Sequence, residues 1–308
     1  MPEMNLLRAI LLKLISAFLF AVMSVLVRYL GERYPVGQIV FFRSLFAVLP
    51  VAVIYAWRRE LATAVRTTRL LGHAGRGAIS IGGMFLNFSS LARLPLVDAT
   101  AIQFAAPFIT VAMSAVVLKE RVRAYRWTAV IVGFFGILVM LAPYFEPSQH
   151  AAITAATTLG LGFAIAGAFC NAGAVIQTRR LTETEATSSI VFYFSIICAL
   201  AGLATWPLGW VKPTWIEFAA LVTTGLCGGL AHILLTESYR WAPASLIAPF
   251  DYTSMLWAFV LGYLVFAEVP TVFVFFGALI IAGAGLFVIW RERRLGPSRP
   301  RSGPPGGA

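Results

Sequence analysis

The chain has 308 residues, of which 59% are hydrophobic and only 12% are charged. A soluble domain of this length would carry about twice that share of charged residues, so the composition excludes a soluble globular protein and predicts a membrane protein. The net charge of +11 does not indicate a nucleic-acid partner, because the Lys and Arg residues lie in short clusters between apolar runs and form no separate basic face.

Ten apolar stretches follow one another along the chain. Each is close to the length of about 20 residues that a helix needs to cross a bilayer. They span 9–30, 36–57, 74–93, 96–118, 125–143, 153–177, 187–208, 215–238, 244–266 and 270–290. Hydrocarbon offers the backbone no hydrogen-bond partner, so each stretch is expected to form a helix. The sequence therefore predicts an all-α integral membrane protein with about ten transmembrane helices.

The basic residues predict the orientation of these helices. If the N-terminus lies inside, only four Lys or Arg residues fall in outer segments, namely Arg28, Arg33, Arg93 and Lys212. Nearly all the others fall in inner segments, as the positive-inside rule requires. We expect a multi-pass protein of a bacterial-type inner membrane with both termini cytoplasmic. The Pro- and Gly-rich residues 291–308 are expected to form a disordered, basic cytoplasmic tail.

Two halves of the chain are similar to each other at a shift of about 150 residues. Pro95 corresponds to Pro243, and Glu120 corresponds to Glu268. The motif Gly136-Ile137-Leu138-Val139 corresponds in the same order to Gly285-Leu286-Phe287-Val288. The shared order and the near-constant shift indicate an internal repeat.

The repeat divides the chain into residues 9–143, a linker at 144–152, and residues 153–290. Each half holds five predicted spans. An odd number of spans forces the second half to enter the membrane upside down relative to the first. Such inverted repeats are typical of secondary transporters, in which the binding site lies near the midplane between the halves.

Several motifs resemble a known family. The segment Leu118-Lys119-Glu120-Arg121 ends the fourth stretch and is followed by Trp127 and by Gly133-Phe134-Phe135-Gly136. Together with the segment 91–101 and with Phe41-Phe42-Arg43-Ser44, these motifs resemble the EamA-domain proteins of the drug/metabolite transporter superfamily over about residues 9–290.

The resemblance implies a ten-helix basket around a central cavity and the transport of a small organic solute, such as an amino acid, a nucleoside, riboflavin, S-adenosylmethionine or a sugar. It does not fix the substrate. The chain departs from the usual Gly-Glu at the end of the ninth span, where it has Ala267-Glu268.

Ionisable residues inside a span cost about 2.5–3.5 kcal/mol each at mid-membrane, so each requires a reason. Arg43 lies within the second predicted span. One interpretation is that Arg43 binds an anionic substrate group such as a carboxylate. The other is a structural ion pair with Asp98, at the start of the fourth span.

Asp251 lies in the ninth predicted span, at the position that corresponds to Gln103 in the fourth. A polar position retained in both halves suits a midplane cavity, so both residues are candidates for substrate binding. Asp251 is also the candidate for proton coupling. The alternative is a carboxylate near a helix end that reaches solvent or Arg240.

Further polar and aromatic residues within the spans could line the cavity. These additional substrate-binding candidates are Asn87, Asn171, His232 and Tyr252. For each of the three polar residues the alternative is a hydrogen bond between helices, and for Tyr252 it is simple packing. We expect structural roles for Pro107 and Pro249 as helix breaks, and for Glu120 and Glu268 as partners of Arg residues or caps of neighbouring helices.

No common catalytic or nucleotide-binding motif occurs, and neither a cofactor nor a metal site is predicted. The sequence therefore predicts a secondary transporter that moves a small, amino-acid-like metabolite by alternating access, driven by protons or by exchange. The expected partners are the substrate, the lipid bilayer and protons; nothing in the sequence indicates an oligomeric state. A membrane-embedded enzyme or a non-transporting sensor or scaffold are the alternatives.

Overall fold

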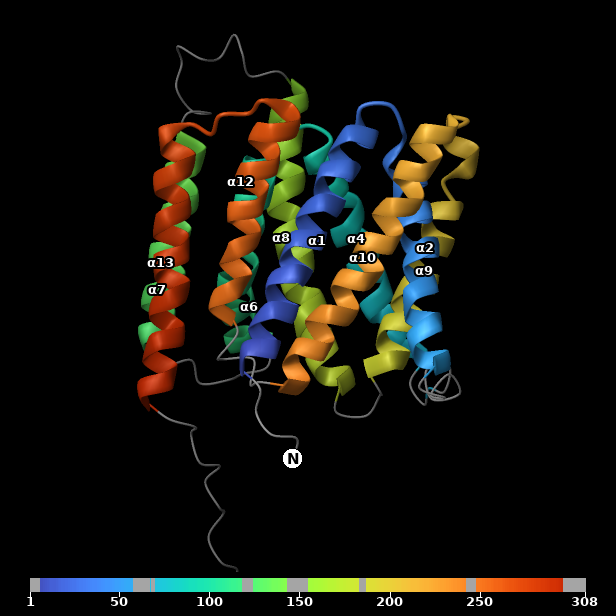
Figure 1. Ribbon diagram of the computed structural model, residues 1–308. Coiled ribbons are helices and arrows are strands. Elements are labelled where there is room, and N and C mark those ends of the chain that lie inside the picture. The colour runs from blue at the N-terminus through green and yellow to red at the C-terminus, as the bar shows by residue number, and fades with distance from the viewer. Residues whose placement is uncertain are drawn as a thin grey trace, which may run out of the picture.

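The computed structural model describes residues 6–57, 67, 70–117, 124–142, 155–182, 187–241 and 248–295. This part of the chain is almost entirely helical and contains no strand. The helices run roughly parallel to one another and form a single bundle (Figure 1). Glu120, the predicted linker 144–152 and residues 296–308 of the predicted tail lie outside the described residues.

The helices of the first half match its five predicted spans. They are α1 (Leu6–Gly31), α2 (Val36–Trp57), α4 (Leu70–Leu91), α5 (Leu96–Gln103) with α6 (Ala106–Val117), and α7 (Ala124–Leu141). Helices α5 and α6 together form the fourth span.

The second half repeats this order. It contains α8 (Ala155–Thr182), α9 (Thr187–Leu203) with the short helix η3 (Trp206–Leu208), α10 (Trp215–Trp241), η4 (Ala248–Tyr252) with α12 (Thr253–Phe266), and α13 (Val272–Leu295). Helix α13 continues past the predicted end at residue 290, so the first residues of the predicted tail are helical.

The composition of these helices suits a bilayer. Within the described residues, six spans are long and apolar enough to cross a membrane, and three shorter apolar helices accompany them. Helix α4 is less apolar because it carries His73 and Arg76. Large apolar side chains face outward, such as those of Ile131, Phe135 and Leu264, which are all more than half exposed. A lipid environment would cover these side chains, so the fold is that of a multi-pass membrane protein.

The two halves are inverted and pack symmetrically. In Figure 1, α1 begins at the lower end of the bundle and α8 begins at the upper end. Helix α1 packs on α10, and its counterpart α8 packs on α4, which is the counterpart of α10. The contacts of α2 with α10 and of α4 with α9 form a second such pair, while α7 packs on its own counterpart α13. The contacts thus follow a two-fold relation between the halves.

The fourth and ninth spans both depart from a regular α-helix at corresponding positions. Between α5 and α6, the N–H of Phe104 donates to the carbonyl of Ala101, and the N–H of Ala105 donates to that of Ile102. Pro107 falls in the first turn of α6, where a missing N–H costs nothing. In the second half, the 3-10 helix η4 contains Pro249 and leads directly into α12.

Two aromatic rings meet between the interruption of the fourth span and η4. The rings of Phe104 and Tyr252 stack with their centroids 5.3 Å apart. The two residues occupy corresponding positions in the halves, so the stack joins the fourth span to the ninth.

Small residues on α10 allow α2 to approach closely. A Cβ added at Gly225 would lie 2.5 Å from the Cβ of Phe46, and one added at Gly229 would lie 2.6 Å from the Cγ of Pro50. This GxxxG step therefore serves helix packing, as such steps commonly do in membranes.

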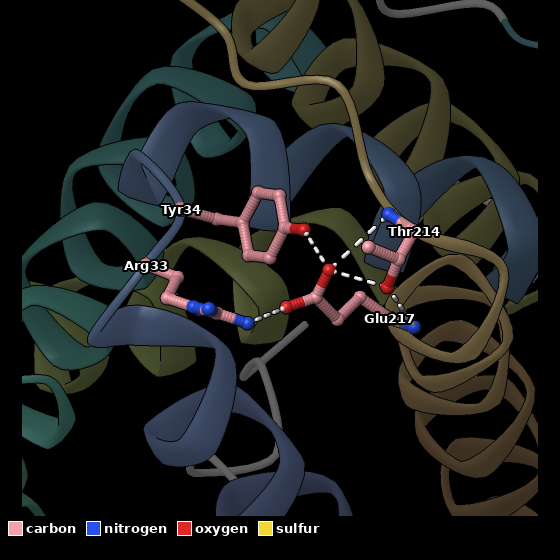
Figure 2. A network of polar contacts seen from close by, with 4 residues as sticks. All are labelled: Arg33, Tyr34, Thr214 and Glu217. Atoms are coloured by element: carbon pink, nitrogen blue, oxygen red, sulfur yellow. Dashed lines mark hydrogen bonds and ion pairs between the residues drawn. The ribbon is translucent and has the colours of Figure 1, made fainter.

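A polar network ties the halves together at the end of the bundle where α1 ends. Glu217 accepts hydrogen bonds from Arg33 at 2.5 Å, from the Tyr34 hydroxyl at 2.6 Å and from the Thr214 hydroxyl at 2.5 Å (Figure 2). The hydrogen bond from Arg33 to Glu217, and the charge of Glu217, raise the pKa of Arg33. Burial and the same carboxylate raise the pKa of Tyr34, so its hydroxyl stays protonated and able to donate.

Glu268 provides a second link at this end. Its carboxylate forms an ion pair with Arg28 of α1 and accepts a hydrogen bond of 2.9 Å from the backbone N–H of Leu96. The last residues of the ninth span thus cap the first turn of the fourth span.

Candidate functional site

A cavity of about 480 Å³ lies between the two halves of the bundle. Its walls come from α1, α2, α4 and α5 of the first half and from α8, α9, α10 and α12 of the second. This volume is in the range of pockets that bind small molecules. This cavity is therefore the candidate functional site.

Five of the seven predicted substrate-binding residues line this cavity. They are Arg43, Asn87, Gln103, Asn171 and His232. Asp251 and Tyr252 are not among the described residues that line it. The structure therefore brings together residues from five helices, and it leaves the proton-coupling candidate outside the cavity wall.

Arg43 is the most deeply buried charge in the cavity, with only 4% of its surface exposed. Its guanidinium lies 5.9 Å from the ring centroid of Phe194, while its Nε and Nη1 have no hydrogen-bond partner among the described residues. The ion pairs found among those residues do not include one between Arg43 and Asp98. Asp98 instead lies buried in the first turn of α5, where a carboxylate is favoured by the helix dipole.

Gly228 makes room for the Arg43 side chain. A Cβ at this position would lie 3.2 Å from Nε of Arg43 and 2.9 Å from Sδ of Met23. The absence of a side chain on this face of α10 lets the guanidinium lie against the helix.

Arg76 is a cavity residue that the sequence analysis missed. It lies in α4 and lines the cavity, and its Nη1 donates a hydrogen bond of 2.9 Å to the carbonyl of Ile190. Its guanidinium lies 5.3 Å from the ring centroid of Phe194. Arg76 is one of the basic residues that the orientation assigns to an inner segment, although its place within the predicted span 74–93 is a signal of burial.

Two amides connect the halves at the cavity wall. Nδ2 of Asn171 donates a hydrogen bond of 2.7 Å to Oε1 of Gln103, and Nε2 of Gln103 donates one of 3.1 Å to the carbonyl of Ala164. Gln103 ends α5 at the interruption of the fourth span, and both of its partners lie on α8. The interruption is thereby held against the second half.

His232 lies among aromatic rings. Its ring meets Phe20 edge-on at a centroid distance of 4.9 Å and Phe194 at 6.4 Å. Asn87 lies on α4, where its backbone carbonyl accepts a hydrogen bond from the hydroxyl of Ser90. The rings of Phe20 and Phe194 thus give the cavity an apolar wall beside the polar side chains of Asn87 and His232.

Asp251 forms an ion pair that the sequence did not predict. Its Oδ1 lies 2.6 Å from Nζ of Lys13 on α1. The Lys13 side chain is only 2% exposed, whereas that of Asp251 is 52% exposed. The pair joins α1 to η4.

In the part of the chain that the structure describes, apolar helices form two inverted halves with a cavity of polar and aromatic side chains between them, which is the architecture of a membrane carrier. The model of the EamA-like transporter family matches residues 7–142 and 158–290, one match in each half. The chain belongs to this family.

Similar proteins carry several different solutes. An S-adenosylmethionine uptake transporter of Rickettsia prowazekii is 30% identical over 298 residues, which cover 95% of each chain. The pseudopaline exporter CntI of Pseudomonas aeruginosa is 30% identical and covers 91% of this chain and 93% of its own. A riboflavin transporter of Rhizobium johnstonii is 26% identical, covering 91% of this chain and 90% of its own.

A solved crystal structure shares the fold. It matches 93% of this chain and 98% of its own length with a TM-score of 0.65 at 17% identity. The family and the named relatives together support a transporter of a small metabolite.

Proposed function

We propose that this protein is a secondary transporter that carries a small carboxylate-bearing, amino-acid-like metabolite across the inner membrane by alternating access. The observation that carries the proposal is Arg43, a buried guanidinium in the central cavity with Nε and Nη1 lacking hydrogen-bond partners among the described residues. A carboxylate would accept a hydrogen bond from one of these groups, and such charge-assisted pairs are strong. The amides of Gln103 and Asn171 would bind the polar part of the same molecule.

Alternating access would follow from the inverted halves. The two halves exchange conformations around a fixed site, so that the cavity opens first to one side and then to the other. In each exchange, contacts at one end must break. The Glu217 network and the Arg28–Glu268 pair are the contacts that would break at the end where α1 ends. With both termini cytoplasmic, as the basic residues predict, this end is the outer one.

Proton coupling would act through the ion pair of Asp251. Protonation of the exposed carboxylate would remove the negative charge beside Lys13 and weaken the link between α1 and η4. Because Asp251 is half exposed, a proton can reach it from solvent. The substrate and the proton would then bind at two different sites, and they would be coupled because each favours one state of the same conformational change.

The experiment is uptake into proteoliposomes of a pooled metabolite panel, read by mass spectrometry, with a pH gradient imposed or collapsed. We expect accumulation of at least one carboxylate-bearing metabolite in wild type and a loss of about tenfold or more in Arg43→Gln. Arg93→Gln is the matched control, because Arg93 is an exposed arginine that does not line the cavity.

The outcomes separate the parts of the proposal. Uptake that follows the pH gradient and loses that dependence in Asp251→Asn supports proton coupling. Uptake that ignores the gradient assigns the protein to facilitated transport or exchange. Absence of uptake in folded protein would contradict the proposal and favour an enzyme or a sensor.

A further inference from the structure

The cavity carries a guanidinium and a group of amides on different helices. The guanidinium of Arg43 lies beside α10, because a Cβ at Gly228 would be 3.2 Å from its Nε. Helix α10 packs on α1 and α2, whereas the amides of Asn87, Gln103 and Asn171 come from α4, α5 and α8. All four side chains line the same cavity. A ligand that binds Arg43 through a carboxylate would therefore meet the amides with a second polar group.

Hydrogen bonds fix the orientation of two of these amides. The carbonyl of Ala164 can only accept, so Gln103 turns its Nε2 toward that carbonyl and its Oε1 toward Asn171. Asn171 must then donate through Nδ2, which leaves its Oδ1 as an acceptor. This oxygen lies beside α4, since a Cβ at Gly83 would be 3.3 Å from it. Gly83 also lines the cavity, so the wall presents an acceptor at this point.

Asn87 adds an amide that no described residue engages. It lies one turn after Gly83 on the same face of α4, and it lines the cavity. Its backbone carbonyl accepts a hydrogen bond from Ser90, but no hydrogen bond among the described residues uses its side chain. The side chain of Asn87 therefore offers both a donor and an acceptor to a ligand.

A neutral carboxamide matches these groups better than an ammonium does. A carboxamide has N–H donors and a carbonyl acceptor, so it can pair with both ends of the Asn87 amide and also donate to Asn171. An ammonium has donors only and would leave the N–H groups of Asn87 without an acceptor. Its charge would also lie in a cavity that holds the buried guanidinium of Arg43. No Asp or Glu is among the described residues that line this cavity.

We infer that the transported molecule is a carboxylate whose second polar group is a neutral carboxamide, bound by Asn87 and Asn171, and not a free ammonium. This inference rests on the proposed transport function and narrows its amino-acid-like substrate to molecules without the positive charge of an amino group. A primary amide and an N-acylated amino group share the chemistry that these side chains recognise.

The test measures ligand affinity from the concentration dependence of the unfolding temperature of the purified full-length protein in lipid nanodiscs. Succinamate is compared with 4-aminobutanoate, which has an ammonium in place of the amide, and with 4-methylpentanoate, which has a similar shape without the amide. The next longer homologues of each probe extend the range of chain lengths. N-acetyl-leucine and leucine form the N-acyl arm.

At least one amide probe is expected to bind at least about tenfold more tightly than its ammonium and apolar counterparts, because a site built to hydrogen-bond a ligand rejects analogues that lack the matching groups. The arm that responds distinguishes a primary amide from an N-acylated amino group.

Asn87→Asp provides the sharpest variant, because it replaces the amide by a carboxylate of nearly the same shape. This carboxylate would compensate an ammonium and has no N–H to donate to the carbonyl of an amide ligand. We therefore expect the preference to reverse, with the ammonium probe bound more tightly than the amide probe. Such a gain of binding does not arise from a folding defect. Asn87→Leu should weaken binding of the amide probe about tenfold and leave that of the apolar probe nearly unchanged.

Ser89→Asp is the matched control for the added charge. Ser89 lies on α4 two residues after Asn87 and is not among the residues that line the cavity. This variant should keep the wild-type preference for the amide probe.

Three results would overturn the inference. They are stabilisation by none of the amide probes, equally tight binding of a matched ammonium or apolar probe to wild type, and a retained preference for the amide probe in Asn87→Asp. If a metabolite with a free ammonium is taken up at the same rate by wild type and Asn87→Leu, the amide inference fails while the transport function stands. If no metabolite is taken up at all, the transport function fails as well.

Discussion

The fourth and ninth spans are irregular at corresponding positions but differ there in chemistry. The fourth is interrupted between α5 and α6, and the described part of the ninth contains the 3-10 helix η4 before α12. In the first half Gln103 lines the cavity and is hydrogen-bonded to α8. In the second half the corresponding Asp251 forms an ion pair with Lys13 of α1 and does not line the cavity.

The repeat therefore retains the position at which each span departs from a regular α-helix. The two halves have diverged in the side chain at that position and in the contacts that it makes. The neutral amide of Gln103 lines the cavity, and the carboxylate of Asp251 pairs with a lysine. A symmetric fold thus places an amide and a charged group at equivalent positions, each next in sequence to one of the stacked rings of Phe104 and Tyr252.

The largest effect is expected where the comparison involves charge. Asp251→Asn leaves the buried ammonium of Lys13 without its carboxylate. Breaking a fully buried pair costs about 3–5 kcal/mol, and we expect a value near 3 kcal/mol or below because Asp251 is 52% exposed. Transport should fall at least about tenfold, as measured by uptake alongside a chemical unfolding curve.

The double variant Lys13→Met with Asp251→Asn controls for this loss. Removing both charges should recover most of the stability, because replacement of a buried ion pair by neutral groups is often nearly neutral. A double variant that is as unstable as the sum of the single variants would argue against the pair.

The next effect concerns the aromatic stack of Phe104 and Tyr252, which joins the fourth and ninth spans. A Cβ added at Gly285 would overlap the hydroxyl of Tyr252. Gly285→Ala should therefore displace Tyr252 from Phe104 and cost about 1–3 kcal/mol. Thermal unfolding and uptake would both report the change.

Gly283→Ala is the matched control on the same helix. A Cβ at Gly283 would have no neighbour within 4 Å, so this variant should be neutral or stabilising by up to about 1 kcal/mol through helix propensity. Equal behaviour of the two variants would contradict the proposed contact.

A smaller effect is expected at Gln103, where the fourth span is interrupted. Asn171→Leu removes the donor to Gln103 and leaves its Oε1 without that hydrogen bond, at a cost of about 1–2 kcal/mol. The double variant with Gln103→Leu should cost less than the two single variants together, and unfolding measurements on the four proteins test this. Strict additivity would show that the two amides act independently.

The smallest effect is expected at the Glu217 network, which lies outside the fourth and ninth spans. Arg33→Gln removes an ion pair whose arginine side chain is 72% exposed, so the cost should stay below about 1 kcal/mol. Tyr34→Phe removes a buried donor to the same carboxylate and should cost more. The reverse order in thermal unfolding would show that burial does not decide which of these two contacts matters more.

The sequence predicted the spans and their inversion well, and it found five residues of the cavity. Hydropathy is read locally, and an odd number of spans in each half leaves only one relative orientation. Arg43, Asn87 and Asn171 were found because a polar residue in an apolar stretch is conspicuous. Arg76 was missed because it lies only a few residues inside its span, where a charge can also be explained by the nearby membrane surface.

What only the tertiary structure decided is which side chains meet. Lys13 and Asp251 are far apart in sequence and show no pattern that pairs them, and the alternatives of Asp98 for Arg43 and of Arg240 for Asp251 were equally compatible with the sequence. The sequence by itself determined that these helices cross a membrane in two inverted halves, because the solvent acts on each segment separately. Packing of helices from both halves decided that two arginines face one ring in the same cavity, because a contact depends on the rotation of both helices that make it.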